Sequence, residues 1–332
     1  MDEKKLSSRE QDDVFSEQYF KPGNVLELDE NPETLEVMEA EIDENKLNGI
    51  NDIRQLIEPV WKYSVDELVN MMSKRVIYET DDVIAFNKPP QMAYSSSTND
   101  QAQLDRILQK LRKSVCPKVE RLHLVTSLDK AISGVVLFAK NSEKQNKLKQ
   151  LIDEDHALLR FRCILKGIPA EQRTRISIPL IKVVKDRDMK LSPLSGEADK
   201  KATVYKMDTD VQVVNENRQA SVSLVDAFIK RGIPHLARSH LYYGINCPII
   251  GDQKYVKKPH GSSKFSIDQI RLSGPANNLL NIKNQEARHL PLCMHLAEIH
   301  VPESRGGKFS VVKAEIPPYL HFILKKFKLL RK

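Results

Sequence analysis

An uninterrupted apolar run, Val135–Phe138, is the feature that most constrains the fold of this chain. It follows Ser133–Gly134, a pair typical of a turn. Four apolar residues in a row between turn residues indicate a strand buried on both faces, because a strand with one face in water alternates polar and apolar residues. Such a strand belongs inside a sheet.

The elements expected around this strand mix helices with strands. Ser64 is a plausible N-cap with Glu67 three positions later, which predicts the start of a helix. Helices are expected at 64–74, 104–111, 142–152 and 319–332, and strands at 76–78, 83–86, 161–165, 202–207, 221–229, 297–301 and 309–316. Because the two kinds of element alternate and no internal repeat is present, we expect one α+β domain.

The charge of the chain is unevenly distributed. Residues 1–60 hold 17 acidic and 6 basic side chains, a net charge of −11, whereas the other 272 residues have a net charge of +18. We therefore divide the chain into an acidic, mostly disordered arm (1–60), a folded domain (61–325) and a basic C-terminal tail (326–332). A folded part with this excess attracts polyanions, of which nucleic acid is the commonest, although a basic surface can also simply favour solubility.

Several classes of protein are disfavoured. No run of eighteen apolar residues is present, and the first residues lack the features of a signal or transit peptide. The four cysteines form no CxxC pair, so a reducing compartment is the default. His289, Cys293 and His295 lack a fourth ligand at a usual spacing, so no metal site is expected.

Asp129 is the first candidate for chemistry. It lies between an apolar flank and the Ser133–Gly134 turn, where a charge is costly unless it is paired. Arg238, in an apolar neighbourhood of its own, is the candidate partner. An ionised carboxylate held by arginine can act as a nucleophile, but it can equally be a structural ion pair or a turn-capping group.

Two segments of the chain resemble the RluA family of pseudouridine synthases. One runs from Leu122 to Lys140 and has Asp129 before Ser133–Gly134 and an apolar strand that ends in Ala139–Lys140. The other runs from Gly232 to Leu241 and is followed by the tail Pro248–Tyr255. Weaker matches occur in the same order at Asn87–Lys88–Pro89, Lys201–Ala202–Thr203 and Met294–His295. The resemblance covers roughly residues 75–325.

The resemblance implies a central mixed, mainly antiparallel sheet flanked by helices, with an RNA-binding cleft. It implies isomerisation of uridine to pseudouridine in RNA, ribosomal RNA first and messenger or transfer RNA second, without a metal or cofactor. In this family Asp129 would be the nucleophile and Arg238 its partner. Phe161 would stack on the uracil, and Lys88, His235 and His240 match motif positions expected to bind substrate.

The chain also departs from the family pattern. Thr126–Ser127 replaces the His–Arg that precedes the aspartate, and Phe161 stands where the family usually has a tyrosine. Ile233 and Leu236 replace an arginine and a glutamine of the second motif. Arg121, His123, Arg160 or Arg162 would then have to supply the lost cation. The alternative to an enzyme is an RNA-binding or ribosome-assembly factor on the same fold.

The stretch Arg288–His295 resembles the eukaryotic mitochondrial branch of the family, so a mitochondrial location is expected. The acidic N-terminus favours the cytoplasm or nucleus instead. We expect a monomer that binds RNA and neither a membrane nor a metal.

Overall fold

The computed structural model describes residues 49–95, 102–185, 188–194, 196, 203–233, 235–255, 271–303 and 309–330. The helices are α2 (Ile50–Gln55), η2 (Val60–Lys62), α3 (Val65–Ser73), α4 (Leu104–Val115), α5 (Ser142–Asp153), α6 (Leu236–Tyr243), α8 (Gly274–Leu280), η3 (Ala287–His289) and α9 (Pro318–Lys326). The strands are β1 (Val76–Glu79), β2 (Val83–Lys88), β3 (His123–Thr126), β4 (Ser133–Ala139), β5 (Leu158–Lys166), β6 (Arg173–Ile176), β7 (Leu180–Lys185), β8 (Asp188–Pro193), β9 (Val204–Tyr205), β10 (Thr209–Asn217), β11 (Val222–Ile229), β12 (Met294–Pro302) and β13 (Phe309–Lys313).

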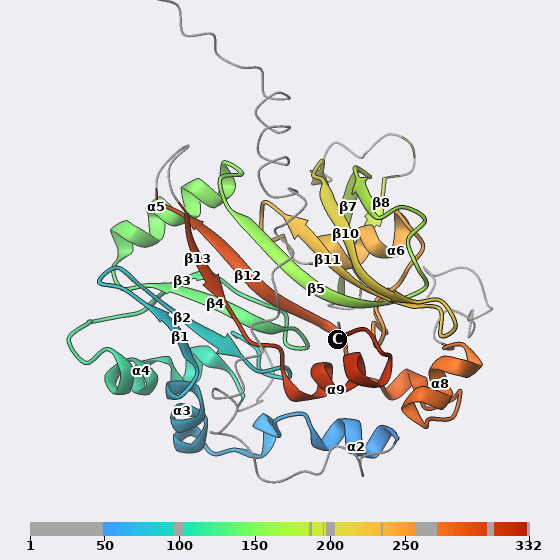
Figure 1. Ribbon diagram of the computed structural model, residues 1–332. Helices are drawn as coiled ribbons and strands as arrows, with labels where there is room; N and C mark the ends of the chain where they lie inside the picture. The colour runs from blue at the N-terminus through green and yellow to red at the C-terminus, as the bar shows by residue number, and fades with distance from the viewer. Residues whose placement is uncertain are drawn as a thin grey trace, which may run out of the picture. The chain divides into compact units, whose positions relative to one another are not determined.

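One large sheet organises the domain (Figure 1). Its strands follow the order β1-β2-β4-β12-β5-β11-β10-β6, with β3 paired to β4 and β13 paired to β12. The contact between β12 and β4 is parallel, whereas the other neighbouring strands are antiparallel. A second, small sheet has the order β8-β7-β9. The predicted α+β class with a mainly antiparallel central sheet is therefore confirmed.

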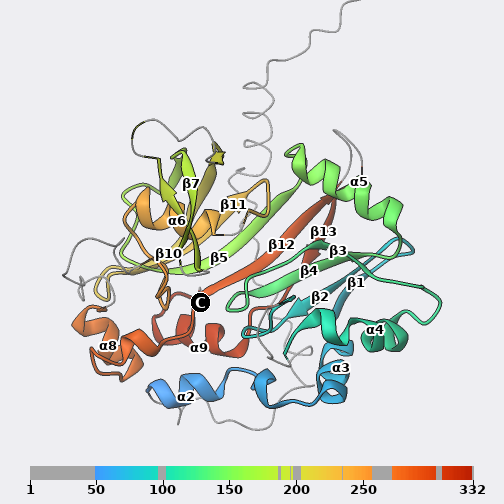
Figure 2. The ribbon, with the colours of Figure 1, turned by 180° about the vertical axis from the view of Figure 1, so that it is seen from behind.

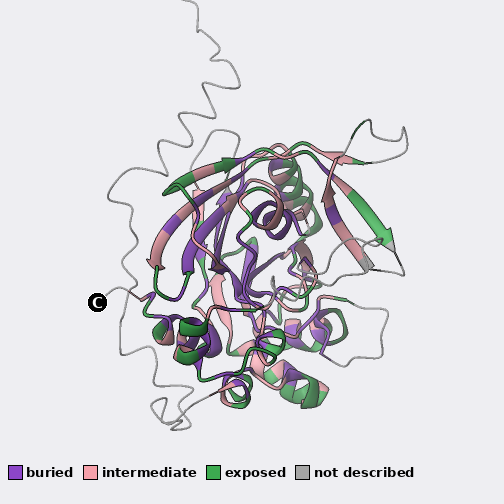
Figure 3. Cartoon of the chain, turned by 90° about the vertical axis from the view of Figure 1, so that its right-hand side faces the viewer, coloured by how far each residue is buried: buried purple, intermediate pink, exposed green. Residues whose placement is uncertain are grey.

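Helices α5 and α6 lie at the upper side of the domain in both views, and the other helices that the figures label, α2, α3, α4, α8 and α9, lie along its lower side (Figure 1 and Figure 2). Helix α5 packs against β3, β4 and β12, and α6 packs against β8, β10 and β11. Buried residues concentrate along the central strands, and exposed ones on the outer sides of the helices (Figure 3). No helix in the described ranges is both long enough and apolar enough to span a membrane.

Several elements form where the sequence predicts them. The Ser64 hydroxyl accepts a hydrogen bond from the Glu67 amide, and the Glu67 carboxylate accepts one from the Ser64 amide, so the capping box of α3 is complete. Strand β4 contains the apolar run, and all seven of its residues are buried. The interpretation of Val135–Phe138 as a strand buried on both faces is confirmed.

Other elements differ from the prediction. The strand expected at 309–316 ends at Lys313, and of the one expected at 202–207 only Val204–Tyr205 forms β9, with Ala202 outside the described residues. Strand β10 was not predicted. It alternates buried residues such as Val211 and Val213 with polar ones, and this period of two is obscured by its acidic and amide side chains.

The ends of the expected domain carry packed residues. Ile53 and Val60 recur at helical spacing near the end of the acidic arm, where the sequence predicts that order begins, and both are fully buried. Phe327, in the predicted tail, is fully buried as well. Residues 1–48 of the arm, and Arg331 and Lys332 of the tail, lie outside the described residues. The limits of the arm and tail otherwise stay predictions.

A glycine allows the parallel contact at the centre of the sheet. Gly134 pairs with Leu296, has φ +122°, and a Cβ built on it would overlap the Leu296 backbone. A side chain there would meet both steric overlap and a backbone conformation that L-residues rarely adopt. Gly134 therefore fixes how closely β4 and β12 approach, a few residues beyond Asp129.

We expect Gly134→Ala to lower the free energy of unfolding by about 2 kcal/mol or more, since it adds backbone strain and overpacking. Chemical denaturation measures this loss. Gly274→Ala is the matched control, because nothing lies within 4 Å of a Cβ at that position. An equal effect of the two substitutions would contradict the role given to Gly134.

Candidate active site

Asp129 and Arg238 meet although 109 positions separate them in the sequence. Asp129 lies in the connection between β3 and β4, where its carbonyl oxygen accepts a hydrogen bond from the Ile132 amide. Arg238 lies in α6, on the other half of the sheet. Its Nη1 donates to Oδ2 of Asp129 at 3.2 Å. The arginine side chain is 8 % exposed and that of Asp129 is 29 % exposed, so the carboxylate is the accessible member of the pair.

A second carboxylate holds the other edge of the guanidinium. Arg238 Nε donates to Oδ2 of Asp252 at 2.8 Å, and Nη2 donates to Oδ1 at 2.7 Å. Burial disfavours the charged guanidinium, but the hydrogen bonds and attraction of Asp252, together with the charge of Asp129, outweigh burial and raise the pKa of Arg238. Arg238 is therefore a fixed cation shared by two acids.

Asp252 had no role in the prediction from the sequence, although it lies in the tail Pro248–Tyr255 that resembles the family motif. The available signal was a second acid in an apolar stretch near the same arginine. The side chain of Asp252 is 1 % exposed. A carboxylate buried to that degree requires a cation or several donors.

His235 lies on the same side of Asp129 as Arg238. It precedes α6 with φ 68°, and its Nε2 is 3.6 Å from Oδ2 of Asp129. Burial lowers the pKa of His235 to about 4, against the opposing effect of the Asp129 charge, so the ring is neutral near pH 7. Its Nδ1 is buried and has no hydrogen-bond partner among the described residues. The tautomer with the proton on Nε2, facing the carboxylate, satisfies the ring best.

These contacts make the two oxygens of Asp129 unequal. Arg238 and His235 both approach Oδ2. Within the described ranges, Oδ1 forms no hydrogen bond or ion pair with the protein. The site thus presents a carboxylate with one oxygen held and the other available to react with a bound molecule.

The charge of Asp129 acts on Lys88, but the hydrogen bonds that Lys88 donates go to backbone carbonyl oxygens and not to Asp129. It is fully buried at the end of β2, and its Nζ donates to the carbonyl oxygens of Pro89 at 3.0 Å and Met92 at 2.7 Å. Burial lowers the pKa of Lys88 to about 7, and Asp129 opposes this shift. These contacts of Lys88 are thus within the protein, and the prediction that it binds substrate gains no support from them.

Phe161 lies at the centre of β5, opposite Ala227 on one neighbouring strand and Leu296 on the other, and is 6 % exposed. Side chains alternate along a strand, so Phe161 points away from the face that carries Arg160 and Arg162.

The two arginines beside Phe161 are already paired. Arg162 donates from Nε and Nη2 to Asp226, at 3.0 and 3.1 Å, and Arg160 Nη2 lies 2.7 Å from Glu298. Both therefore have carboxylate partners within the protein. Of the other two residues proposed to replace the motif arginine, Arg121 is exposed and His123 is half-buried in β3.

His240 has a position of its own. It is fully buried, and its Nδ1 and Nε2 contact Thr209 Oγ1 at 2.8 Å and the Ile178 carbonyl oxygen at 3.1 Å. Two positions along a helix correspond to about 200°, so His240 and Arg238 point in nearly opposite directions. The contacts of His240 tie α6 to β10 and to the segment before β7. The prediction that it binds substrate gains no support from them.

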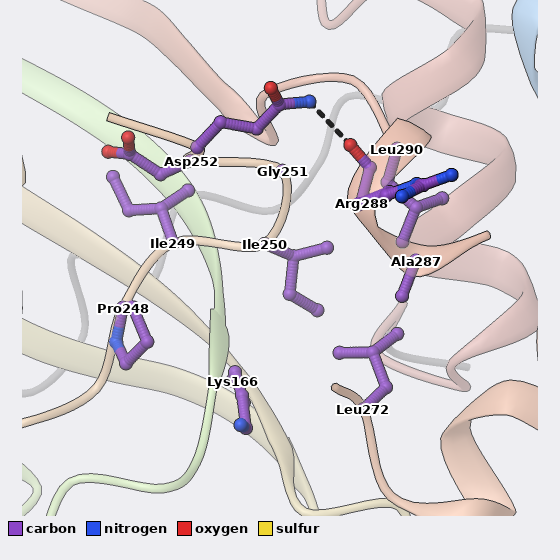
Figure 4. Close-up of a pocket in the computed structure, with 11 residues that line it drawn as sticks. Lys166, Pro248, Ile249, Ile250, Gly251, Asp252, Leu272, Ala287, Arg288 and Leu290 are labelled. Carbon is purple, nitrogen blue, oxygen red and sulfur yellow. Dashed lines mark hydrogen bonds between the residues drawn. The ribbon is translucent and has the colours of Figure 1, made fainter. Parts of the chain in front are cut away.

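A pocket lies beside the loop that carries Asp252 (Figure 4). Its walls include Gly251, Leu272 and Arg288, and the Gln253 side chain donates to the Arg288 carbonyl oxygen across it. The Asp252 carboxylate points away from Arg288 (Figure 4). Among the described residues, no three His, Cys, Asp or Glu side chains gather as metal ligands would.

Comparisons with known proteins agree on one family. Residues 82–243 match the model of the RNA pseudouridylate synthase family. The tRNA pseudouridine synthase C of Haemophilus ducreyi is 30 % identical over 187 residues, which cover 55 % of this chain and 74 % of that protein. The mitochondrial pseudouridylate synthase RPUSD4 of Bos taurus is 24 % identical over 280 residues, 81 % of this chain and 73 % of that protein.

The fold also agrees with a solved structure. The structure of the human RNA pseudouridylate synthase domain containing 4 superimposes on this one with a TM-score of 0.65. The match covers 80 % of this chain and 97 % of the human chain. At 21 % sequence identity, this likeness shows the fold.

We expect the free energy of unfolding to fall as the pH falls from 6.5 toward 4. Burial lowers the pKa of His235 and of His295 to about 4, whereas an unfolded histidine titrates near 6.5. Between these values the unfolded chain binds more protons than the folded one, so acid favours unfolding by about 1 kcal/mol per pH unit for each histidine. Denaturation at a series of pH values measures this slope, and His295→Gln reduces it. An unchanged free energy from pH 7 to pH 5 would contradict the buried neutral state.

Proposed function

This chain belongs to the RNA pseudouridylate synthase family, and from that premise we propose that it isomerises uridine to pseudouridine with Asp129 as the nucleophile and Arg238 as its charge partner. The observation that carries the proposal is the asymmetry of Asp129. One carboxylate oxygen is held by Arg238, and the other has no protein partner in the described ranges. A carboxylate in this state is oriented through one oxygen and has the other free to attack.

In the proposed reaction, Oδ1 of Asp129 forms a bond to the target nucleotide, at C6 of the base or at C1′ of the ribose. The bond between N1 and C1′ breaks, the uracil turns, and C5 bonds to C1′. The C5 proton leaves and N1 gains a proton, so the product is an isomer of the substrate and Asp129 is regenerated. Arg238 stabilises the carboxylate before it attacks and again when it leaves the nucleotide.

Phe161 is the proposed stacking platform for the turned base. An aromatic face stacks on any base, and this interaction is worth about 1–3 kcal/mol. Phenylalanine has no hydroxyl, so the C5 proton must go to another group or to water. The target nucleotide has to leave its helix to reach this site, which favours unpaired or weakly paired uridines.

The proposed substrate is a structured RNA, ribosomal RNA first. The net charge of +18 on residues 61–332 suits a polyanion, and binding should weaken as salt rises. The relative from Haemophilus ducreyi is named for transfer RNA, so transfer RNA is the second substrate to test. The name of the Bos taurus relative supports a mitochondrial location for this chain as well.

Asp129→Asn should abolish pseudouridine formation and leave RNA affinity within about twofold, because the amide keeps the shape of the side chain but is a poor nucleophile. Base-resolved mapping of ribosomal and transfer RNA after incubation with purified protein measures the product, and filter binding measures affinity. Two outcomes would contradict the proposal. In the first, the wild type and Asp129→Asn modify the same sites. In the second, neither protein modifies any site although both bind RNA. The second outcome would favour an RNA-binding assembly factor.

Phe161→Leu should lower kcat/KM by about tenfold or more, because it removes the flat face and keeps an apolar side chain. Phe161→Tyr keeps that face and restores the hydroxyl usual in the family, so we expect at least the wild-type rate. Initial rates on one mapped RNA site compare the three proteins. A leucine variant as fast as the wild type would rule out stacking at this position.

A further inference from the structure

The guanidinium of Arg238 is shared unequally between its two acids. Asp252 takes the Nε–Nη2 edge with two short hydrogen bonds, whereas Asp129 takes only Nη1 at 3.2 Å. Arginine pairs most strongly with a carboxylate through two parallel bonds. The buried acid therefore occupies the stronger site, and the accessible acid receives the weaker one.

We propose that Asp252 is a positioning residue, which holds Arg238 so that only one N–H reaches Asp129 and Oδ1 of Asp129 stays free to react. This inference rests on the proposed function. A guanidinium without Asp252 could turn its paired edge toward Asp129 and bind both carboxylate oxygens. Asp252 prevents that arrangement by occupying the edge first.

The position of Asp252 is fixed by its own loop. Its Oδ1 also accepts hydrogen bonds from the amides of Lys254 at 3.0 Å and Tyr255 at 3.2 Å. The loop is joined to β5, since the Lys166 amide donates to the Pro248 carbonyl oxygen and the Ile250 amide donates to that of Ile164, both at 2.9 Å. The carboxylate is thus anchored to the strand that also carries Phe161.

Tyr255 supports the guanidinium from a second direction. Its ring centroid is 5.4 Å from Cζ of Arg238, and its hydroxyl oxygen accepts a hydrogen bond from the Leu191 amide in β8. A cation over an aromatic face is attracted to it. Arg238 is therefore held in its plane by Asp252 and from one side by Tyr255.

The charges lead to the same conclusion. One cation faces two carboxylates, and Asp252, which accepts two hydrogen bonds from the guanidinium where Asp129 accepts one, weakens the attraction of Arg238 for Asp129 in a poorly solvated site. A carboxylate bound less tightly is the better nucleophile. Asp252 thus balances the two requirements on Asp129, to be ionised and to be reactive.

The test begins with Asp252→Asn, which keeps the shape of the side chain and an oxygen for the two loop amides but removes the charge. We expect the single-turnover rate of pseudouridine formation to fall about ten- to a hundredfold, with RNA affinity within about threefold of wild type. Asp155→Asn is the matched control, since Asp155 takes the Nε–Nη2 edge of Arg231 with two hydrogen bonds, as Asp252 does with Arg238, and has no contact with Asp129. Its rate per folded molecule should equal that of wild type.

A double-mutant cycle with Arg238→Lys separates positioning from a general structural role. If Asp252 acts through Arg238, the double variant is no more than about threefold slower than Arg238→Lys alone. If the rate losses of Asp252→Asn and Arg238→Lys multiply in the double variant, the inference is overturned. An Asp252→Asn variant as fast as wild type would overturn it too. If Asp252→Asn does not fold, Asp252→Ser, which also removes the charge, replaces it, and a wild-type rate there would overturn the inference too. An inactive wild-type protein would instead refute the proposed function.

Discussion

The guanidinium of Arg238 lies between two carboxylates, the buried one of Asp252 and the accessible one of Asp129. Burying this cation is costly, and the hydrogen bonds to Asp252 are the largest contribution that offsets the cost. Because the guanidinium is fixed, the carboxylate of Asp129 is oriented through a single oxygen. The reactivity proposed for Asp129 therefore depends on an ion pair in which Asp129 takes no part.

The sheet explains how these three residues meet. Asp129 comes from the β3–β4 connection, Arg238 from α6, and Asp252 from the loop attached to the end of β5. Strand β12 lies between β4 and β5 and joins the two halves of the sheet. The parallel contact with β4 requires Gly134, which accounts physically for the Ser–Gly pair that follows the aspartate in the sequence.

The sequence predicted the Asp129–Arg238 pair, because a carboxylate beside apolar residues needs a cation and the motif resemblance identified one. Asp252 was given no role, although a second acid near that arginine was a signal, because its pairing with Arg238 depends on how a helix packs against a loop. The sequence also placed His240 with the substrate-binding residues, and this assignment stays a prediction, because a motif gives positions along the chain and not the direction of a side chain. Strand β10 was missed because polar residues outnumber the apolar ones that mark its buried face.

The most direct test of the account is release of tritium from RNA labelled at C5 of uridine, measured in a single turnover with the full chain. Isomerisation replaces the hydrogen on C5 by a bond to C1′, so tritium release reports the reaction itself and not RNA binding. The account predicts that the amount of tritium released matches the amount of target RNA bound. RNA that binds in a salt-sensitive way and keeps all of its tritium would contradict it.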